Sequence, residues 1–204
     1  MKNLGTMDRM VRAFLAELCI LTAFFWTGRD WQIVLYLLAF VLVFQAATGV
    51  CGFYRLIGRN SCERIKRKDK NLIVGTIVFM VFVAGAGSYA SSLVTKNILM
   101  DDLRSIEKPY NLTLSSTDKN QRNESIEGYE LMNTSFVVFN KKYTDYRPLA
   151  LKFDEKFQGD MQNFSLAVKA SRQDIYNGNL SNAHRSLAAA GPIVQGIKER
   201  DDLR

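Results

Sequence analysis

The chain has 204 residues, 48% of them hydrophobic, and a formal net charge of +7. Residues 1–95 contain 11 Lys/Arg against 5 Asp/Glu, and residues 96–204 contain 16 against 15, so the positive charge lies almost wholly in the N-terminal part. A nucleic-acid-binding protein would concentrate basic charge on its soluble part, so no nucleic-acid partner is expected. The C-terminal part has no Cys and one His, which excludes the usual zinc and c-type haem sites, and we expect no cofactor.

The first apolar segment, residues 11–26, is shorter than a typical membrane span and contains Glu17. Its basic start is typical of a signal peptide, but no A-x-A-like cleavage site follows it. The link 27–31 has only five residues and leads straight into the next apolar segment, which indicates a tight helical hairpin. Glu17 is an intramembrane carboxylate that either faces a neighbouring helix or the interface, or marks an ion or proton path.

Two further segments, 31–50 and 72–95, carry no charge and are at least twenty residues long. At about 1.5 Å per residue, twenty residues cross a hydrocarbon core of about 30 Å. Trp31 and Tyr36 lie near the outer edge of the first of these segments, as interfacial aromatic residues do. The sequence therefore predicts an all-α protein with three transmembrane helices, the third within residues 71–95.

The link between the second and third apolar segments is strongly basic. The positive-inside rule places such a link in the cytoplasm, which puts the N-terminus inside and everything after residue 95 outside. In a bacterium, outside means the periplasm. The link could also bind anionic lipid headgroups. Its basic residues are Arg55, Arg59, Arg64, Lys66, Arg67, Lys68 and Lys70, against the acidic Glu63 and Asp69.

The third apolar segment contains small residues at a spacing of four, which places them on one helix face. Small residues at this spacing let two helix backbones approach closely. We predict a helix-packing interface there, with this chain's own hairpin, a second copy or another protein as the partner. The predicted interface residues are Ala84, Gly85, Gly87, Ser88 and Ser91.

Two motifs, N-L-G-T-M-D-R-M-V-R at 3–12 and T-G-V-C-G-F-Y-R-L-I-G-R-N-S-C at 48–62, resemble the YgaP-like transmembrane domain, a two-span bacterial domain of unknown function. The resemblance covers residues 1–65 and implies a paired-helix hairpin in a bacterial inner membrane. Some members of that family are fused to a rhodanese sulfurtransferase, but nothing after residue 70 resembles one. The sequence departs from the family pattern at Gly52, where Pro is usual, and at Glu17. The residues that fit are Asn3, Gly5, Asp8, Arg9, Arg12, Cys51, Tyr54, Leu56, Gly58, Asn60 and Cys62.

Cys51 and Cys62 lie at the predicted cytoplasmic end of the hairpin, close in sequence to Arg55 and Arg59. Neighbouring positive charge favours a thiolate, so the two could form a redox or persulfide-carrying pair. The alternative is that both are small apolar residues at the interface, kept reduced by the cytosol.

Residues 96–204 are predicted to form a helical bundle of three or four helices. The third membrane helix is expected to continue to Pro109, and residues 109–123, rich in Asn, Ser and Thr, to form a loop. Apolar residues recur at helical spacing in 124–145, 149–177 and 180–200. Arg147-Pro148 and Asn177-Gly178-Asn179 are expected to separate these helices, and Pro192 to kink the last.

One candidate contact site lies in this outer part. Tyr143, Tyr146 and Arg147 cluster at the first predicted corner of the bundle and could form an aromatic and cationic contact site, or could hold the corner together. His184, the single histidine, lies near a predicted helix start. It is expected to be a polar structural residue, with a role as a ligand or proton shuttle as the alternative.

No nucleophile-base pair, carboxylate dyad, phosphate loop or cofactor motif is present in the sequence, so we expect no enzyme. The leading hypothesis is an accessory or scaffolding subunit in the bilayer that binds other membrane or periplasmic subunits, or itself. Ligand sensing by the bundle through a partner protein is one alternative. Cysteine-based redox or sulfur handling at the cytoplasmic face is another.

Overall fold

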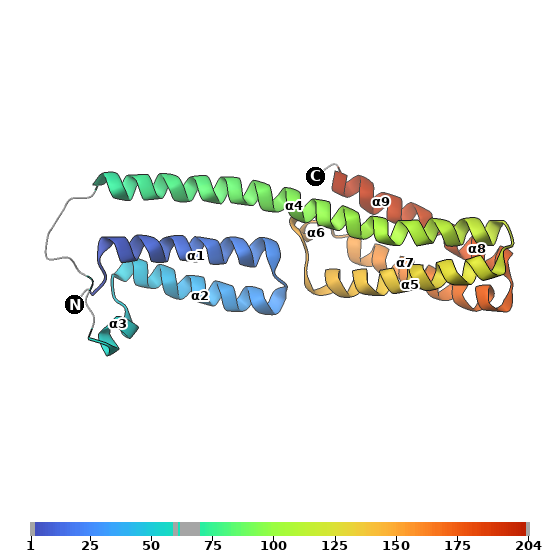
Figure 1. Ribbon diagram of the computed structural model, residues 1–204, viewed down its shortest axis with the longest axis horizontal. Coiled ribbons are helices and arrows are strands. Elements are labelled where there is room, and N and C mark those ends of the chain that lie inside the picture. Colours follow the sequence, from blue (N-terminus) through green and yellow to red (C-terminus); the bar gives the residue numbers. More distant parts are fainter. Residues whose placement is uncertain (1–2, 59–60, 62–69, 203–204) are drawn as a thin grey trace. The chain divides into compact units, whose positions relative to one another are not determined.

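A computed structural model describes residues 3–58, 61 and 70–202, and all the regular elements in those ranges are helices, with no strand among them. The all-α prediction is thereby confirmed. The chain divides into two compact units, Met1–Leu93 and Val94–Arg204 (Figure 1). We refer to them as the N-terminal unit and the C-terminal unit. The residues of the basic link beyond Gly58, apart from Ser61 and Lys70, lie outside the described ranges.

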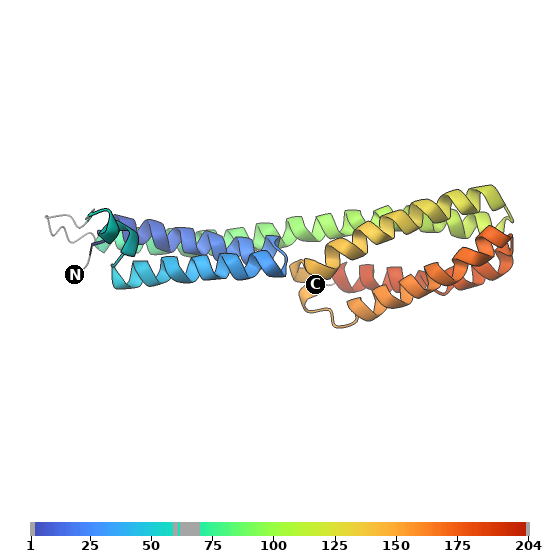
Figure 2. The same ribbon diagram turned by 90° about the horizontal axis from the view of Figure 1, so that it is seen from below.

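The N-terminal unit is built on a helical hairpin. Its first helix, α1 (Thr6–Trp26), is followed after two residues by the antiparallel α2 (Arg29–Thr48), as Figure 2 shows. This confirms the tight hairpin expected from the short link. Gly49 ends α2 with a φ of 70°, a left-handed conformation that favours glycine, and its N–H donates to Gln45 O at 2.9 Å. A short helix, α3 (Gly52–Leu56), comes next.

Two helices in the described ranges are long and apolar enough to cross a membrane. They are α2 and α4 (Lys70–Asp118), with mean hydropathies of 1.9 and 2.0 in their most apolar stretches. Large apolar side chains on both are exposed, including Phe40 and Phe82 at 68% each. Such surfaces suit a lipid environment rather than water. The third candidate, α1, is less apolar because it carries four charged residues, Asp8, Arg9, Arg12 and Glu17.

The helix α4 does not end at Pro109, so the loop predicted for residues 109–123 is wrong. It continues to Asp118 because its buried face runs through the proline without a break, from Leu103 to Tyr110 to Thr117. The hydroxyls that suggested a loop donate to carbonyls one turn back, as Thr113 Oγ1 does to Pro109 O at 2.7 Å. These bonds satisfy the polar side chains within the helix, and only residues 119–121 form the turn to the next helix.

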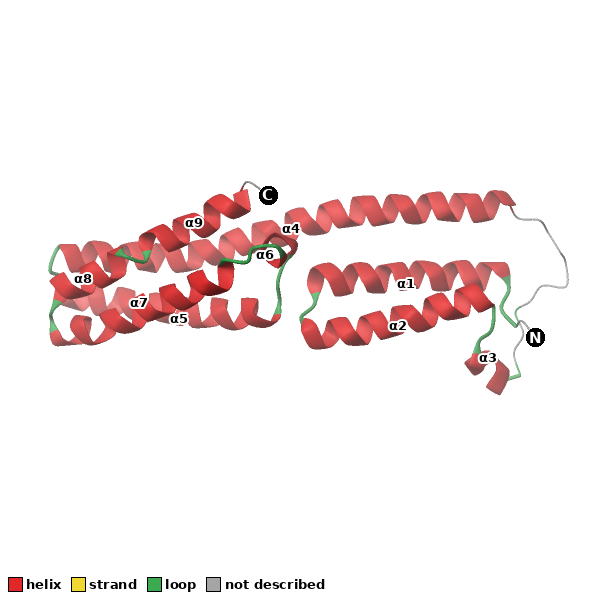
Figure 3. Ribbon diagram, turned by 180° about the vertical axis from the view of Figure 1, so that it is seen from behind, coloured by secondary structure: helices red, strands yellow, loops and turns green. Residues whose placement is uncertain are grey.

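The C-terminal unit contains the second part of α4 and the helices after it, which lie side by side in Figures 1 and 3. As predicted, α5 (Arg122–Asp145) ends before Pro148, and Gly178 caps α7 (Phe157–Asn177) with a φ of 82°. The predicted helix 149–177 is in fact two, because α6 (Leu149–Lys152) ends before α7 begins. The predicted kink at Pro192 is a break, since α8 (Leu180–Ala188) stops before α9 (Gly191–Asp202).

Aromatic side chains fill the core of the C-terminal unit. Phe164 on α7 is 1% exposed, and its ring centroid lies 5.0 Å from that of Phe136 and 6.1 Å from that of Tyr110. These three rings come from α7, α5 and α4, so the core ties together helices that are distant in sequence. Buried aromatic residues contribute the largest apolar areas to a core, which makes this cluster a main source of stability.

Polar contacts link the same helices. Ser125 Oγ on α5 donates to Ser116 Oγ on α4 at 3.1 Å, next to Gly128, where the two backbones come close. At the other side of the unit, Arg200 Nε on α9 donates to Asp154 Oδ2 at 3.0 Å and the same guanidinium pairs with Asp160. The Asp154 side chain is only 2% exposed, so this ion pair is a largely buried link between α9 and the segment before α7.

Candidate functional site

The residues of the first sequence motif lie at the end of the hairpin where α1 begins and α2 ends. The Asn3 side chain makes two hydrogen bonds with one backbone residue. Its Nδ2 donates to Cys51 O at 2.8 Å, and its Oδ1 accepts from Cys51 N at 2.8 Å. The Asn3 and Leu4 backbone N–H groups donate to Gly49 O at 3.0 and 3.1 Å. The segment before α1 is thereby held against the segment after α2.

Gly5 extends this contact to Ser61. Its N–H donates to Ser61 Oγ at 3.0 Å, and Ser61 N donates to Asn3 O at 3.1 Å. A Cβ atom at Gly5 would collide with the Ser61 carbonyl oxygen, so the site requires glycine for close approach.

Two arginines of the same motif complete the cluster. Arg9 Nε donates to Ala46 O at 2.5 Å and Arg9 Nη2 to Ala47 O at 3.1 Å. These carbonyls belong to the last turn of α2, where an arginine satisfies free acceptors and the helix dipole favours a cation. Arg12 Nη1 donates to Gln45 Oε1, and its guanidinium lies 5.3 Å from the centroid of the Tyr54 ring. We call Asn3, Gly5, Arg9, Arg12, Gly49, Cys51 and Ser61 the hairpin clamp.

Changing Gly5 to alanine is expected to open the hairpin clamp. The added methyl group must push away the Ser61 backbone, and the bonds of Asn3 to Cys51 depend on the same segment. Because Cys51 is 2% exposed, opening should speed the reaction of its thiol with a maleimide several-fold, as read by peptide mass spectrometry. Gly52→Ala is the matched control, since a Cβ there meets nothing within 4 Å. Equal labelling of Cys51 in both variants would contradict the close approach.

The cysteines predicted as a redox pair are only partly described. Cys51 is buried within the hairpin clamp, and Cys62 lies outside the described residues. Cys19 is half-buried in α1. A buried thiol with its backbone locked by Asn3 is typical of a structural cysteine, because a reactive thiol needs access to its substrate.

Glu17 lies on α1 and lines a cavity of about 420 Å³ among α1, α2 and α4. Both of its carboxyl oxygens are buried, and the carboxyl group lies near the backbone of Ala84 on α4. The rest of the lining is aliphatic and rich in alanine: Ala13, Ala16, Ile20, Leu21, Val43, Ala46, Ala47, Met80 and Ala84. The structure therefore places Glu17 toward neighbouring helices.

Most of the predicted small-residue interface faces this chain's own α1. A Cβ at Gly87 would lie 3.4 Å from Leu21 Cδ1, and Trp26 Nε1 donates to Ser91 Oγ at 3.1 Å. Ala84 lines the cavity with Glu17, and Ser88 is half-buried. Gly85 is different, because it is exposed and a Cβ there meets nothing within 4 Å.

The predicted contact residues of the C-terminal unit do not form one site. The rings of Tyr143 and Tyr146 lie 6.3 Å apart, with Arg147 half-buried beside them in sequence. His184, on α8, instead lies beside the end of α4, where its Nδ1 is 3.1 Å from Leu114 O and 3.3 Å from Thr117 Oγ1. The imidazole therefore links α8 to α4.

Tyr143 is buried at the end of α5 and bonded to α4. Its hydroxyl donates to Asp102 Oδ2 at 2.6 Å, and Lys142 Nζ lies 2.5 Å from the same oxygen. Burial and, second, the hydrogen bond to Asp102 raise the pKa of the Tyr143 phenol well above its usual value of about 10. The neutral phenol is therefore the form that the fold stabilises.

Alkaline pH is expected to destabilise the C-terminal unit through Tyr143. The stabilisation by the neutral phenol is complete below the unfolded pKa of about 10 and is lost as pH rises from there toward the higher folded pKa. Tyr143→Phe cannot ionise, so its helix content, followed by circular dichroism, should fall less steeply above about pH 10. At neutral pH the variant should lose about 1 kcal/mol with the hydrogen bond. An unchanged alkaline slope would contradict this role.

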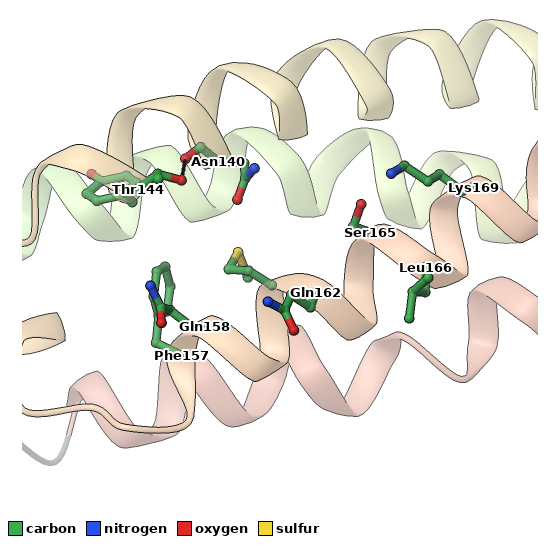
Figure 4. A pocket seen from close by; sticks show the side chains of 10 residues that line it. Asn140, Thr144, Phe157, Gln158, Gln162, Ser165, Leu166 and Lys169 are labelled. Carbon is green, nitrogen blue, oxygen red and sulfur yellow. Dashed lines mark hydrogen bonds between the residues drawn. The ribbon is translucent and has the colours of Figure 1, made fainter.

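Between α5 and α7 lies a groove that the sequence reasoning did not anticipate (Figure 4). It consists of a cavity of about 510 Å³ and a second of about 290 Å³ that share Asn140, Ser165 and Lys169. The lining residues recur every three or four positions on both helices, a pattern that sequence alone does not distinguish from a solvated face. They are Asn133, Phe136, Val137, Asn140, Lys141, Tyr143, Thr144, Phe157, Gln158, Met161, Gln162, Ser165, Leu166, Val168 and Lys169.

The comparisons with known proteins concern the N-terminal unit. Residues 1–64, about a third of the chain, match the family model described as "Inner membrane protein YgaP-like, transmembrane domain". Neither the comparison with curated proteins nor that with solved structures gave a match. The match spans both motifs of the hairpin clamp and agrees with the apolar helix α2. Residues 1–64 therefore match a YgaP-like transmembrane domain, and this match together with the apolar helices supports a membrane location.

Proposed function

We propose that this chain is a non-catalytic accessory subunit of the bacterial inner membrane. Its N-terminal unit anchors it with three transmembrane helices, α1, α2 and the first part of α4. Its C-terminal unit, a helical bundle in the periplasm, binds partner proteins. The observation that carries the proposal is the contrast between the two units. One exposes large apolar side chains along its helices, and the other buries most of its aromatic residues in one core and links its helices by ion pairs.

The third span in this proposal is α1. With 21 residues it has a length of about 31 Å, enough for the hydrocarbon core. Arg9 and Arg12 lie near its start, where they bond to the end of α2, so their charges fall at the interface. Glu17 lines a cavity shared with α2 and α4, so its carboxyl group faces neighbouring helices and not lipid.

The polar groups of the bundle support a binding role rather than catalysis. Three side chains that could serve as acids or bases are engaged between elements of the bundle: Asp102 with Tyr143, Asp154 with Arg200, and His184 with the end of α4. Pairing of this kind positions helices. An accessory subunit needs a rigid folded surface of this kind, held at the membrane by its anchor.

Affinity purification from native membranes followed by mass spectrometry tests the partner. We expect a stoichiometric membrane or periplasmic protein, or a second copy of the chain, to copurify in mild detergent. A solitary, monodisperse monomer would refute the accessory role. Gly85 lies on the exposed face of α4, so Gly85→Leu should weaken the binding of a partner protein in the membrane. Gly87→Leu should instead disturb the contact of α4 with α1.

The orientation has its own test. A single cysteine placed at Ser181, an exposed residue of α8, should react with a membrane-impermeant maleimide in intact spheroplasts. The native Cys62, in the basic link predicted to be cytoplasmic, should react only after permeabilisation. Protection of the residue-181 cysteine until lysis would overturn the periplasmic assignment while leaving the membrane anchoring intact.

A further inference from the structure

The groove between α5 and α7 has the features of a ligand site rather than of a solvated helix face. Its two cavities, of about 510 and 290 Å³, are in the range of small-molecule pockets. Along α5 it extends from Asn133 to Thr144, a length of about 16 Å at 1.5 Å per residue. It therefore suits one elongated small molecule.

One end of the groove is polar and positively charged. Lys141 of α5 and Lys169 of α7 line the smaller cavity together with Asn133, Asn140 and Ser165. In Figure 4 the Lys169 side chain reaches over the groove above Ser165. The residues lining both cavities include no acidic side chain, and neither lysine forms an ion pair with any residue in the described ranges. No ion pair among the described residues therefore neutralises the positive charge at this end.

The larger cavity has an apolar floor. Phe157, Met161 and Leu166 of α7 line the larger cavity with Tyr143 of α5. Leu166 is 64% exposed, so it can be covered by a ligand without any rearrangement of the core. Aromatic and methionine side chains pack readily against flat or aliphatic groups. Gln158 and Gln162 stand at the edge of this floor in Figure 4 and can bond to polar groups of a ligand.

From this arrangement we infer that the groove binds a small organic anion, with its charged group between Lys141 and Lys169 and its apolar body over Phe157, Met161 and Leu166. Two lysines beside amide groups suit a carboxylate, sulfonate or phosphate. The apolar floor selects a molecule with an aromatic or aliphatic body over a simple inorganic ion. Such a site would make the C-terminal unit a receptor for a soluble molecule, a role independent of any membrane partner.

Fluorine NMR on the full chain in dodecyl maltoside tests the site, with 4-(trifluoromethyl)benzoate as the probe and the uncharged 4-(trifluoromethyl)benzamide as its matched control. The benzoate should bind to the wild-type chain above the level of empty micelles, and more tightly than the benzamide. Lys169→Gln should raise the benzoate dissociation constant about fivefold, which corresponds to the upper end of what one solvent-exposed charge pair contributes. Lys119→Gln, at an exposed lysine of the α4–α5 turn, should leave it within about twofold.

A change in the floor separates the two parts of the site. Leu166→Ser should weaken the binding of both the benzoate and the benzamide, because it removes apolar surface and leaves the lysine charges in place. Since Leu166 and Lys169 are exposed, both variants should retain the amide protection of α5 and α7 in hydrogen exchange. Benzoate binding no stronger than benzamide binding, binding unaffected by Lys169→Gln, or no binding above empty micelles would overturn the inference. The accessory role is tested separately, by copurification of a partner protein, and none of these outcomes bears on it.

Discussion

Replacing Phe164 with alanine is expected to cost the C-terminal unit about 3–5 kcal/mol of stability, the usual effect of removing a buried phenylalanine ring. The ring is 1% exposed and contacts rings from two other helices, Phe136 at 5.0 Å and Tyr110 at 6.1 Å between centroids. Its removal leaves a cavity that the three helices can fill only by moving together. Hydrogen exchange of α5 and α7 amides in the full chain measures the loss.

The control for this substitution lies in the same unit. Phe153, between α6 and α7, is 69% exposed, so Phe153→Ala should change the exchange of the same amides by less than about 0.5 kcal/mol. If the free energy of unfolding of the C-terminal unit is smaller than the cost of Phe164→Ala, the Phe164→Ala variant should lose all amide protection in that unit. The amides of the N-terminal unit should keep their protection. Equal effects at Phe164 and Phe153 would show that the ring cluster is not the core of the unit.

Gly128→Ala is expected to destabilise the contact of α4 with α5 by about 1–3 kcal/mol, the range for overpacking in a well-packed interior. A Cβ at Gly128 would lie 2.7 Å from Thr113 Oγ1, 3.2 Å from Thr113 N and 3.3 Å from Thr113 Cα. The hydroxyl cannot easily turn away, because it donates to Pro109 O at 2.7 Å. The backbone atoms cannot yield without moving α4, so the two helices must separate.

Gly159 supplies the comparison for Gly128. It also lies within a helix, but a Cβ there meets nothing within 4 Å, so Gly159→Ala should stabilise α7 by up to about 1 kcal/mol through helix propensity. Thr113→Ala combined with Gly128→Ala should restore part of the loss by removing the hydroxyl. Exchange rates of α5 amides report all three variants. A neutral Gly128→Ala would contradict the close approach of the helices.

The contact at Gly128 also explains why the segment after Pro109 is helical although its composition predicts a loop. Ser and Thr are weak helix formers on their own, since their side chains compete for backbone groups. In α4 they are the small residues that let α5 approach, and Thr113, Ser116 and Thr117 are all buried. This advantage exists only when α5 is in place, so no local pattern in residues 109–123 could reveal it.

Other features were predictable because their causes are local. Pro148 cannot continue α5, and Gly178 takes a left-handed conformation that favours glycine, so both helix ends could be read from the residues themselves. The hairpin of α1 and α2 also has a local cause, because only Thr27 and Gly28 separate the two helices. The motif residues were recognisable by resemblance, but their role in holding the hairpin clamp required the bonds from Asn3 to Cys51 and from Arg9 to α2.

The sequence by itself determined that the chain is helical, that its apolar residues are concentrated in membrane-type segments, and that residues 1–64 resemble a known transmembrane domain. Each of these depends on composition or on neighbours along the chain. Only the tertiary structure decided that Gly87 and Ser91 face α1, that His184 binds the end of α4, and that Lys141 and Lys169 line one cavity. These are contacts between residues on different helices, and their formation depends on how whole helices pack rather than on the local sequence.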